Sequence, residues 1–222
     1  MGSDMTLALT LPAPSLARVL ANCLAHMPAR SRFPFCVLDA TETALVAWAS
    51  DGYTLGQDRA EGKSQDFGAE AWVLGLAETK ELESWARWCK KREVTMSASK
   101  SALTARWAEY EPKDDETEAY ELSLSLGETR GVDHLRKLLP LLEKPAQGVG
   151  ELTVFRPEYL GRWAKTKYEG DTLVMERVGR ALRVRQGETF VGLLMPVDLD
   201  PDASVSSAHE TRHPHRVQEA GM

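Results

Sequence analysis

The residues that could carry out covalent chemistry are few and scattered along this sequence. It contains no glycine-rich phosphate-binding loop, no His-Glu-x-x-His pair for zinc and no Gly-x-Ser-x-Gly nucleophile turn. Asp39 and Asp51 could act as acid–base groups, but Asp51 stands directly before Gly52, and an Asp-Gly pair is typical of a turn. We therefore expect no catalytic residue and no cofactor, and the sequence indicates a protein that is not an enzyme.

The cysteine and histidine residues do not form a metal-binding pattern either. Cys23, Cys36 and Cys89 are an odd number and include no Cys-x-x-Cys pair, which argues against a disulfide scaffold or a zinc site and favours a reducing cytoplasm. Cys23 and Cys89 fall on apolar helix faces, so we expect both to be inert core residues. Three histidines at 209–215 could bind a metal, but no ordered shell is expected around them, so no metal site is predicted.

Composition narrows the class of protein further. Hydrophobic residues make up 43% of the 222 residues, which is enough for a core and excludes wholesale disorder. No apolar run is long enough for a transmembrane helix and no signal peptide is visible, so we expect a cytoplasmic protein. With 27 basic and 33 acidic residues the net charge is −6, so any contact with nucleic acid must use a local basic face.

Hydrophobic periodicity predicts short strands alternating with three helices. The helices are expected at 16–27, 80–91 and 157–168. Ser15 and Thr79 are expected to cap the first two, and Leu160 and Trp163 to point inward from the third. The strands are expected at 6–11, 33–39, 44–49, 53–57, 71–75, 94–99, 101–107, 120–126, 152–155, 172–177, 181–185 and 190–197.

The order of these elements predicts an α+β chain with internal repetition. A strand and a helix are followed by several strands, and this series recurs along the chain. The spacing favours antiparallel pairing over parallel crossovers. We expect one domain over residues 5–140, a shorter one over 141–199 and a disordered tail over 200–222.

Five segments, in the same order, resemble the bacterial sliding clamp, the β subunit of DNA polymerase III. The segment 49–55 is similar to the T-D-G-x-R-L turn of that family's middle domain, although Thr54 stands where the motif has arginine. The other four are residues 10–27, similar to that domain's first strand and helix, 131–140, similar to F-P-D-Y-R-R-V-L-P, 155–160, similar to F-N-P-x-Y-L, and 193–197, similar to V-x-M-P-M.

The resemblance implies a DNA-clamp-like fold, with repeated strand-helix-strand units, antiparallel sheets outside and helices packed on the inner face. Residues 5–140 would match the family's middle domain and 141–199 the end of its last domain. The resemblance departs from the family in length, because its first domain has no counterpart here and the final unit is under half as long as residues 6–140.

The resemblance also implies two sets of functional residues. A hydrophobic peptide pocket would be formed by Gly52, Tyr53, Leu55, Val132, Leu138, Leu193, Met195, Pro196 and Val197. Six basic residues would face duplex DNA without sequence specificity: Arg18, Arg87, Lys90, Lys91, Arg162 and Lys165.

The function implied is that of a sliding-clamp-like processivity factor in DNA replication. Such a protein encircles duplex DNA as a homo-oligomeric ring and tethers a DNA polymerase, and it meets the polymerase and the clamp loader through short hydrophobic peptides. Two alternatives stay open. One is a clamp-fold protein-interaction module that does not encircle DNA and binds replication proteins or clamp-binding peptides; the other is a small enzyme with scattered catalytic residues.

Overall fold

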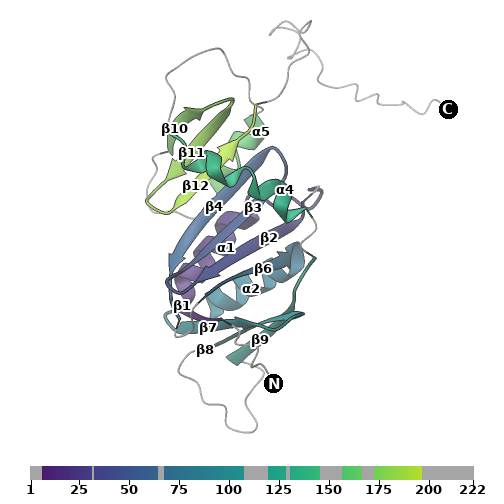
Figure 1. The fold of residues 1–222 in the computed structure, drawn as a ribbon. Helices are drawn as coiled ribbons and strands as arrows, with labels where there is room; N and C mark the ends of the chain where they lie inside the picture. Colours follow the sequence, from purple (N-terminus) through teal and green to yellow (C-terminus); the bar gives the residue numbers. More distant parts are fainter. Residues whose placement is uncertain are drawn as a thin grey trace, which may run out of the picture.

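Two antiparallel sheets and two long helices make up most of the part of the chain that the structure describes. The computed structural model describes residues 7–31, 33–64, 68–107, 120–128, 131–145, 157–166 and 173–196. The expected strand at 152–155, the acidic segment 109–118 and the tail 200–222 lie outside these ranges. Figure 1 shows the two sheets stacked along the long axis of the molecule, with helices α1 and α2 between and behind them.

Three repeat units follow one another in the chain. Unit 1 consists of β1 (Ala8–Pro12), α1 (Ala13–Leu24), β2 (Phe35–Thr41), β3 (Ala44–Ser50) and β4 (Thr54–Glu61). The two-residue strand β5 (Lys63–Ser64) leads to unit 2, which consists of β6 (Ala69–Gly75), α2 (Leu76–Trp88), β7 (Glu93–Ala98), β8 (Ala102–Trp107) and β9 (Glu121–Ser125). After α4 (Val132–Arg136) and the 3-10 helix η1 (Leu139–Leu142), unit 3 consists of α5 (Pro157–Leu160), η2 (Trp163–Lys165), β10 (Leu173–Val178), β11 (Ala181–Gln186) and β12 (Phe190–Leu194).

Units 1 and 2 exchange their first strands. The five-stranded sheet has the order β5-β1-β7-β8-β9, so the first strand of unit 1 lies beside unit 2. The seven-stranded sheet has the order β10-β11-β12-β4-β3-β2-β6, so the first strand of unit 2 lies beside unit 1. Unit 3 continues this second sheet through β12. All pairings between the described strands are antiparallel, which confirms the predicted α+β class.

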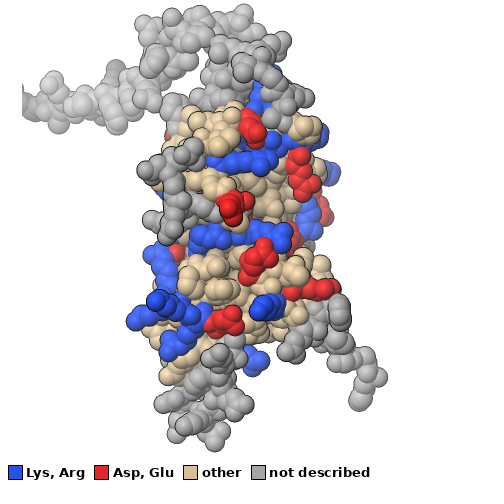
Figure 2. Space-filling view, turned by 90° about the vertical axis from the view of Figure 1, so that its left-hand side faces the viewer, with Lys and Arg blue, Asp and Glu red and all other residues tan. Residues whose placement is uncertain are grey.

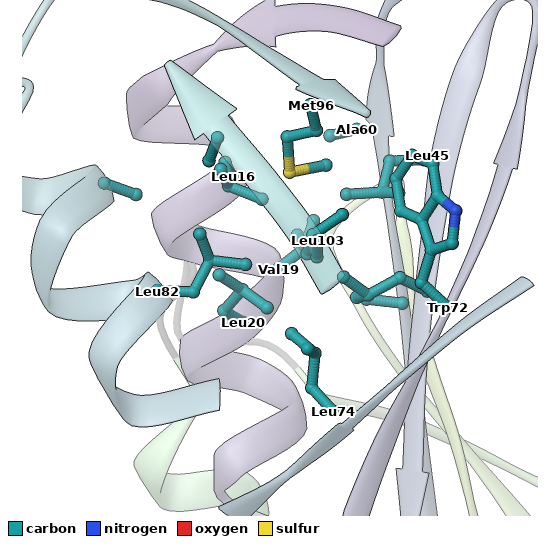
Figure 3. Close-up of a cluster of buried hydrophobic side chains, with 14 of the residues drawn as sticks. Leu16, Val19, Leu20, Leu45, Ala60, Trp72, Leu74, Leu82, Met96 and Leu103 are labelled. Atoms are coloured by element: carbon teal, nitrogen blue, oxygen red, sulfur yellow. The ribbon is translucent and has the colours of Figure 1, made fainter. Parts of the chain in front are cut away.

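The main core lies between α1, α2 and both sheets. Apolar residues at helical spacing in α1, such as Leu16, Val19 and Leu20, are fully buried against Leu82 of α2 and the sheet residues shown in Figure 3. Alternate residues of β2 and β3 enter the same core because successive side chains of a strand point to opposite faces. Cys23, Cys36 and Cys89 are free thiols buried in this core.

A second layer covers the opposite face of the seven-stranded sheet. Val37 and Trp48 point away from the main core and pack beneath Val132 and Leu135 of α4. Because both of its faces are covered, β3 is buried at almost every position, which explains its nearly continuous apolar sequence. Figure 1 shows α4 in front of the sheet and α1 behind it.

The predicted helix starts need correction. Helix α1 begins at Ala13, before Ser15, because Pro12 and Pro14 fit the first turn, where no backbone hydrogen bond is lost. Helix α2 begins at Leu76 rather than beyond Thr79. The Thr79 hydroxyl donates to the Gly75 carbonyl at 2.7 Å from inside the first turn, so it does not act as an N-cap.

The third helix is shorter than its apolar spacing predicts. Helix α5 ends at Leu160, and a 3-10 turn follows from Trp163. This break turns the side chains relative to a continuous helix: Trp163 is buried as expected, but Tyr159 is buried while Leu160 is 39% exposed. The predicted domain boundary after residue 140 falls inside η1, and the division into domains stays a prediction.

Close packing where unit 3 joins unit 1 gives a first test of the fold. A Cβ atom on Gly192 of β12 would lie 2.5 Å from the Leu55 carbonyl oxygen of β4 and 3.1 Å from the Trp163 ring. Backbone atoms cannot move aside as a flexible side chain can, so Gly192→Ala should lower the free energy of unfolding by about 1–3 kcal/mol. Urea denaturation would measure this, with Gly127→Ala as the control, since its nearest neighbour would be an ordinary 3.5 Å away. Equal stability of the two variants would contradict the close approach of β4 and β12.

Candidate functional site

A hollow lies over the junction of β4 and β12. These strands pair antiparallel, with Leu55 opposite Leu193 and Thr54 opposite Leu194. The hollow has a volume of about 610 Å³, within the size range of small-ligand and peptide sites. Four separate parts of the chain line it: Pro28, Arg30, Ser31 and Phe33 after α1; Asp51, Gly52 and Tyr53 before β4; His134, Leu135 and Leu138 around α4; and Tyr159, Arg162 and Met195 of the third unit and its end.

The β3–β4 turn presents Tyr53 to this hollow. One carboxylate oxygen of Asp51 accepts hydrogen bonds from the Tyr53 and Thr54 backbone N–H groups, at 3.0 and 2.7 Å. Gly52 has φ +93°, a left-handed conformation that favours glycine. The Met195 N–H donates to the Tyr53 carbonyl at 2.8 Å, so the turn and the end of β12 are held together.

Two tyrosines form an aromatic wall. The rings of Tyr53 and Tyr159 are stacked, with centroids 5.0 Å apart and an angle of 12° between the planes. Tyr53 is 52% exposed, whereas Tyr159 is buried behind it. Apolar side chains of Leu135, Leu138 and Met195 complete the lining, so the hollow offers an apolar surface with an aromatic face.

A buried ion pair fixes one side of the hollow. Arg162 pairs with the second carboxylate oxygen of Asp51 and donates to the Thr54 hydroxyl at 2.9 Å. The side chains of Arg162 and Asp51 are only 14% and 4% exposed, so the two charges largely neutralise each other. Arg30 also lines the hollow but is exposed to solvent.

His26 supports this arrangement from below. Its Nδ1 atom lies 3.1 Å from the Thr54 hydroxyl, and its ring contacts Trp163 edge-on at 5.0 Å between centroids. Complete burial, assisted by the charge of Arg162, lowers the pKa of His26 to about 3, against a weaker opposing effect of Asp51. Gly56 leaves space for the ring, since a Cβ atom there would overlap it.

The carboxylate and imidazole side chains closest to the β3–β4 turn, Asp51 and His26, are engaged or buried. Both carboxylate oxygens of Asp51 are engaged, and the neutral ring of His26 is buried away from the hollow. Among the residues that the structure describes, no group of three or more metal-ligating side chains is found. What the hollow presents is a stacked aromatic pair, apolar walls and an exposed cation at the rim.

The structure brings part of the predicted pocket set together. Gly52, Tyr53, Leu138 and Met195 line the hollow. Leu55 and Leu193 lie directly beneath it as register partners in a buried cluster. Val132 of α4 is buried against Val37 and Trp48, Pro196 is half-buried, and neither is part of the lining. Val197 lies outside the described residues.

The predicted DNA-facing set is divided. Arg162 belongs to the hollow, because the break after α5 turns it toward Asp51. Arg18 bridges units 1 and 3: its guanidinium donates to buried Asp58 at 2.6–2.7 Å and to the Thr189 hydroxyl at 2.8 Å. Arg87 is exposed but pairs with Glu83 one helical turn away.

The other three predicted DNA-facing residues are exposed lysines. Lys90 and Lys91 lie in the turn that follows α2, and Lys165 lies in η2. Figure 2 shows one face of the molecule, on which Lys and Arg side chains are interspersed with Asp and Glu. A uniformly basic surface is not seen on this face.

Several lining residues do not follow from the sequence patterns. Tyr159 stands in the segment similar to F-N-P-x-Y-L, but that segment predicts only the start of a helix. The stretch from Pro28 to Phe33 has no periodic pattern that would predict a lining role. The usable signal is Asp51, whose second oxygen needs a partner once the first has satisfied the turn.

The fold defined by these elements is that of DNA sliding clamps: α+β, with two antiparallel sheets and packed helices. A DNA polymerase sliding clamp from Pseudomonas aeruginosa matches with a TM-score of 0.65 and 11% identity, over 90% of this chain and 69% of that one. One from Bacillus subtilis gives 0.65 and 14%, over 90% and 66%. A Helicobacter pylori β clamp bound to a DNA ligase peptide gives 0.60 and 11%, over 90% and 68%.

The likeness extends over part of those proteins and rests on structure. This chain spans about two thirds of the length of the clamp chains that it matches. No protein-family model and no curated protein sequence matches it. None of the described helices is both long and apolar enough to cross a membrane.

The buried histidine predicts a pH dependence of stability. Because the pKa of His26 is about 3 in the folded protein and near 6.5 when the chain unfolds, the unfolded state binds the extra proton first as pH falls. Stability should therefore be complete above pH 6.5 and fall as the pH drops toward 3, by about 2 kcal/mol at pH 5 from this group alone.

Urea denaturation between pH 7 and pH 5 would measure this loss in the native protein and in His26→Gln. The variant keeps a polar side chain near Thr54 but cannot titrate, so its stability should change less over this range. Parallel pH profiles of the two proteins would show that His26 is not the group responsible.

Proposed function

We propose that this chain is a clamp-fold protein-interaction module that binds a short hydrophobic segment of a partner protein in the hollow beside Tyr53. The observation that carries the proposal is the convergence of the β3–β4 turn, α4, α5 and the end of β12 on one apolar, aromatic-walled cavity. The H. pylori clamp with the same fold is described as bound to a DNA ligase peptide, which supports the same kind of ligand here.

The lining suggests how such a segment would be held. A leucine, methionine or phenylalanine side chain would lie against the stacked tyrosines and Met195, where flexible thioether and aromatic surfaces adapt to different shapes. An acidic residue beside that anchor would meet Arg30 at the rim. Arg162 would not serve this purpose, because Asp51 already neutralises it.

The position of Arg162 offers an explanation for why Thr54 stands where the sliding-clamp motif has arginine. The sliding-clamp motif T-D-G-x-R-L places an arginine where this chain has Thr54. Here a guanidinium reaches the Thr54 hydroxyl from another element, at 2.9 Å. We infer that Arg162 takes over the cationic position of the motif from the unit 3 side.

Encirclement of duplex DNA by a homo-oligomeric ring is the second candidate function. The clamp fold and the exposed residues Lys90, Lys91 and Lys165 favour this function. In it, a clamp loader would place the ring on DNA and the ring would tether a DNA polymerase. The charge of the two long helices argues against it. Helix α1 has one charged residue, basic, and α2 has three acidic and two basic ones, so together they carry no net charge. A surface that faces phosphates without sequence preference needs clustered positive charge.

Replacing two lining residues would test the hollow. The double variant Tyr53→Ala/Met195→Ala should weaken binding of a fluorescent peptide containing a Leu-Phe pair by about 2 kcal/mol, or roughly 30-fold, because both anchors lose apolar contact. Fluorescence anisotropy measures the affinity. Trp88→Ala is the matched control, since Trp88 is an equally exposed aromatic (49%) that is not part of the lining. Unchanged affinity in a folded double variant would remove the assignment.

Topology-dependent retention on DNA would distinguish the two candidate functions. The absence of net charge on α1 and α2 predicts weak, salt-sensitive binding that is equal on nicked circular and linear duplexes. Gel filtration of the protein with each DNA at low and moderate salt would measure it. Retention on the circle that survives salt and is lost on linearisation would establish encirclement instead.

A further inference from the structure

An exposed aromatic surface lies at the end of α2 and takes no part in lining the hollow. All six tryptophans are within the described ranges, and Trp88, in the last turn of α2, is the only one of them that is exposed, at 49%. The rings of Trp88 and of Trp107 in β8 are stacked, with centroids 5.4 Å apart and 21° between their planes. The stack covers part of one face of Trp88, so solvent reaches the ring from its other side.

The ring beneath Trp88 is held in place by several contacts. The indole N–H of Trp107 donates to the Cys89 thiol at 3.1 Å, and the ring of Tyr120 stands nearly perpendicular to it at 4.2 Å between centroids. The guanidinium of Arg92 lies over the Trp107 ring, 3.6 Å from its centroid. Trp107 itself packs against the main core. These planar groups form a fixed aromatic platform, with Trp88 as its exposed end.

Positive charge gathers in the turn that follows the platform. Lys90, Lys91 and Arg92 are consecutive in the sequence, and all three are exposed. Lys90 has φ +55° and is the one non-glycine residue with a positive φ among those described. Helices commonly end on glycine in this conformation, so the chain keeps a charged side chain where glycine would be less strained.

Acidic residues near the platform limit what positive charge alone can select. Glu83 pairs with Arg87, and the acidic segment 109–118 follows Trp107 in the sequence. A ligand recognised only as an anion would therefore be held weakly here. The exposed face of Trp88 is the feature that can distinguish one anionic ligand from another.

We propose that this platform binds single-stranded nucleic acid, with one base stacked on the exposed face of Trp88 and the neighbouring phosphates on Lys90 and Lys91. Unpaired bases stack on aromatic side chains without sequence preference, while cations beside the aromatic group hold the backbone. A duplex keeps the faces of its bases inside its own stack, so it would meet only the charged part of this surface. The binding requires neither a ring nor a ligand in the hollow.

Fluorescence anisotropy of the full chain with a labelled oligothymidylate of about 16 nucleotides tests the proposal. Trp88→Leu keeps an apolar side chain but loses the planar face, so it should weaken binding roughly tenfold. Trp88→Phe keeps an aromatic face and should bind within about threefold of the native chain. The same oligothymidylate paired with oligoadenylate should bind the native chain roughly tenfold more weakly, because its bases cannot stack on the platform.

The two lysines are tested by the salt dependence of binding. Lys90→Asn/Lys91→Gln should lower the slope of log affinity against log salt concentration by about 1.4, since each phosphate contact with a single strand contributes about 0.7. Asparagine is chosen at position 90 because it tolerates the left-handed backbone. Lys100→Gln/Lys137→Gln makes the same charge change at two exposed lysines outside the platform and should leave the slope unchanged.

Circular dichroism and urea denaturation would show that each variant is folded. The proposal would be overturned by a native chain that does not bind the oligothymidylate at tens of micromolar, by equal affinity for the duplex, or by native affinity in Trp88→Leu. A change in slope as large in Lys100→Gln/Lys137→Gln would contradict it as well. Displacement of the strand by polyglutamate of matched charge as readily as by unlabelled oligothymidylate would instead indicate an acidic protein segment as the ligand.

Discussion

The antiparallel pairing of β4 with β12 is the interaction on which the rest of the structure depends. It joins the third unit to the first, and it places the turn at Gly52 beside the backbone of Met195. The apolar contact of Leu55 with Leu193 lies below this joint and the hollow lies above it. Without this pairing, the residues that line the hollow would lie in units 1 and 3 with no sheet to hold them together.

Buried charges specify how the joint is assembled. Asp51 meets Arg162 on one side of the junction, and Asp58 meets Arg18 and Thr189 on the other. The Asp51–Arg162 pair links unit 1 to unit 3. Asp58 and Arg18 both belong to unit 1, and the Thr189 hydroxyl of unit 3 donates to Asp58. Each carboxylate is nearly inaccessible to solvent. A carboxylate in such a place is stable only with its partner present, so the pairs penalise any other register or docking angle.

The sequence predicted the local elements better than the long-range contacts. Alternation in strands, the Asp51-Gly52 turn and the apolar stripe of α1 depend on neighbouring residues, so the antiparallel α+β class and the turn before Tyr53 followed from them. The expectation that Tyr53 lines a pocket came from the resemblance to the sliding clamp. The ion-pair contacts of two arginines did not follow from the sequence. Arg18 and Arg162 have the spacing of outward helix residues, but their partners lie 40 and 111 residues away, and a helical period carries no information about such contacts.

These arginines also show why the clamp fold alone does not define a function. The same positions that would face phosphates on a basic helix here hold the protein together, and α1 and α2 carry no net charge between them. A guanidinium held by a buried carboxylate cannot be given to a phosphate without leaving that carboxylate unpaired. The fold thus supplies the sheets and the joint, whereas the character of the hollow is set by the side chains that line it, most of which are aromatic or apolar.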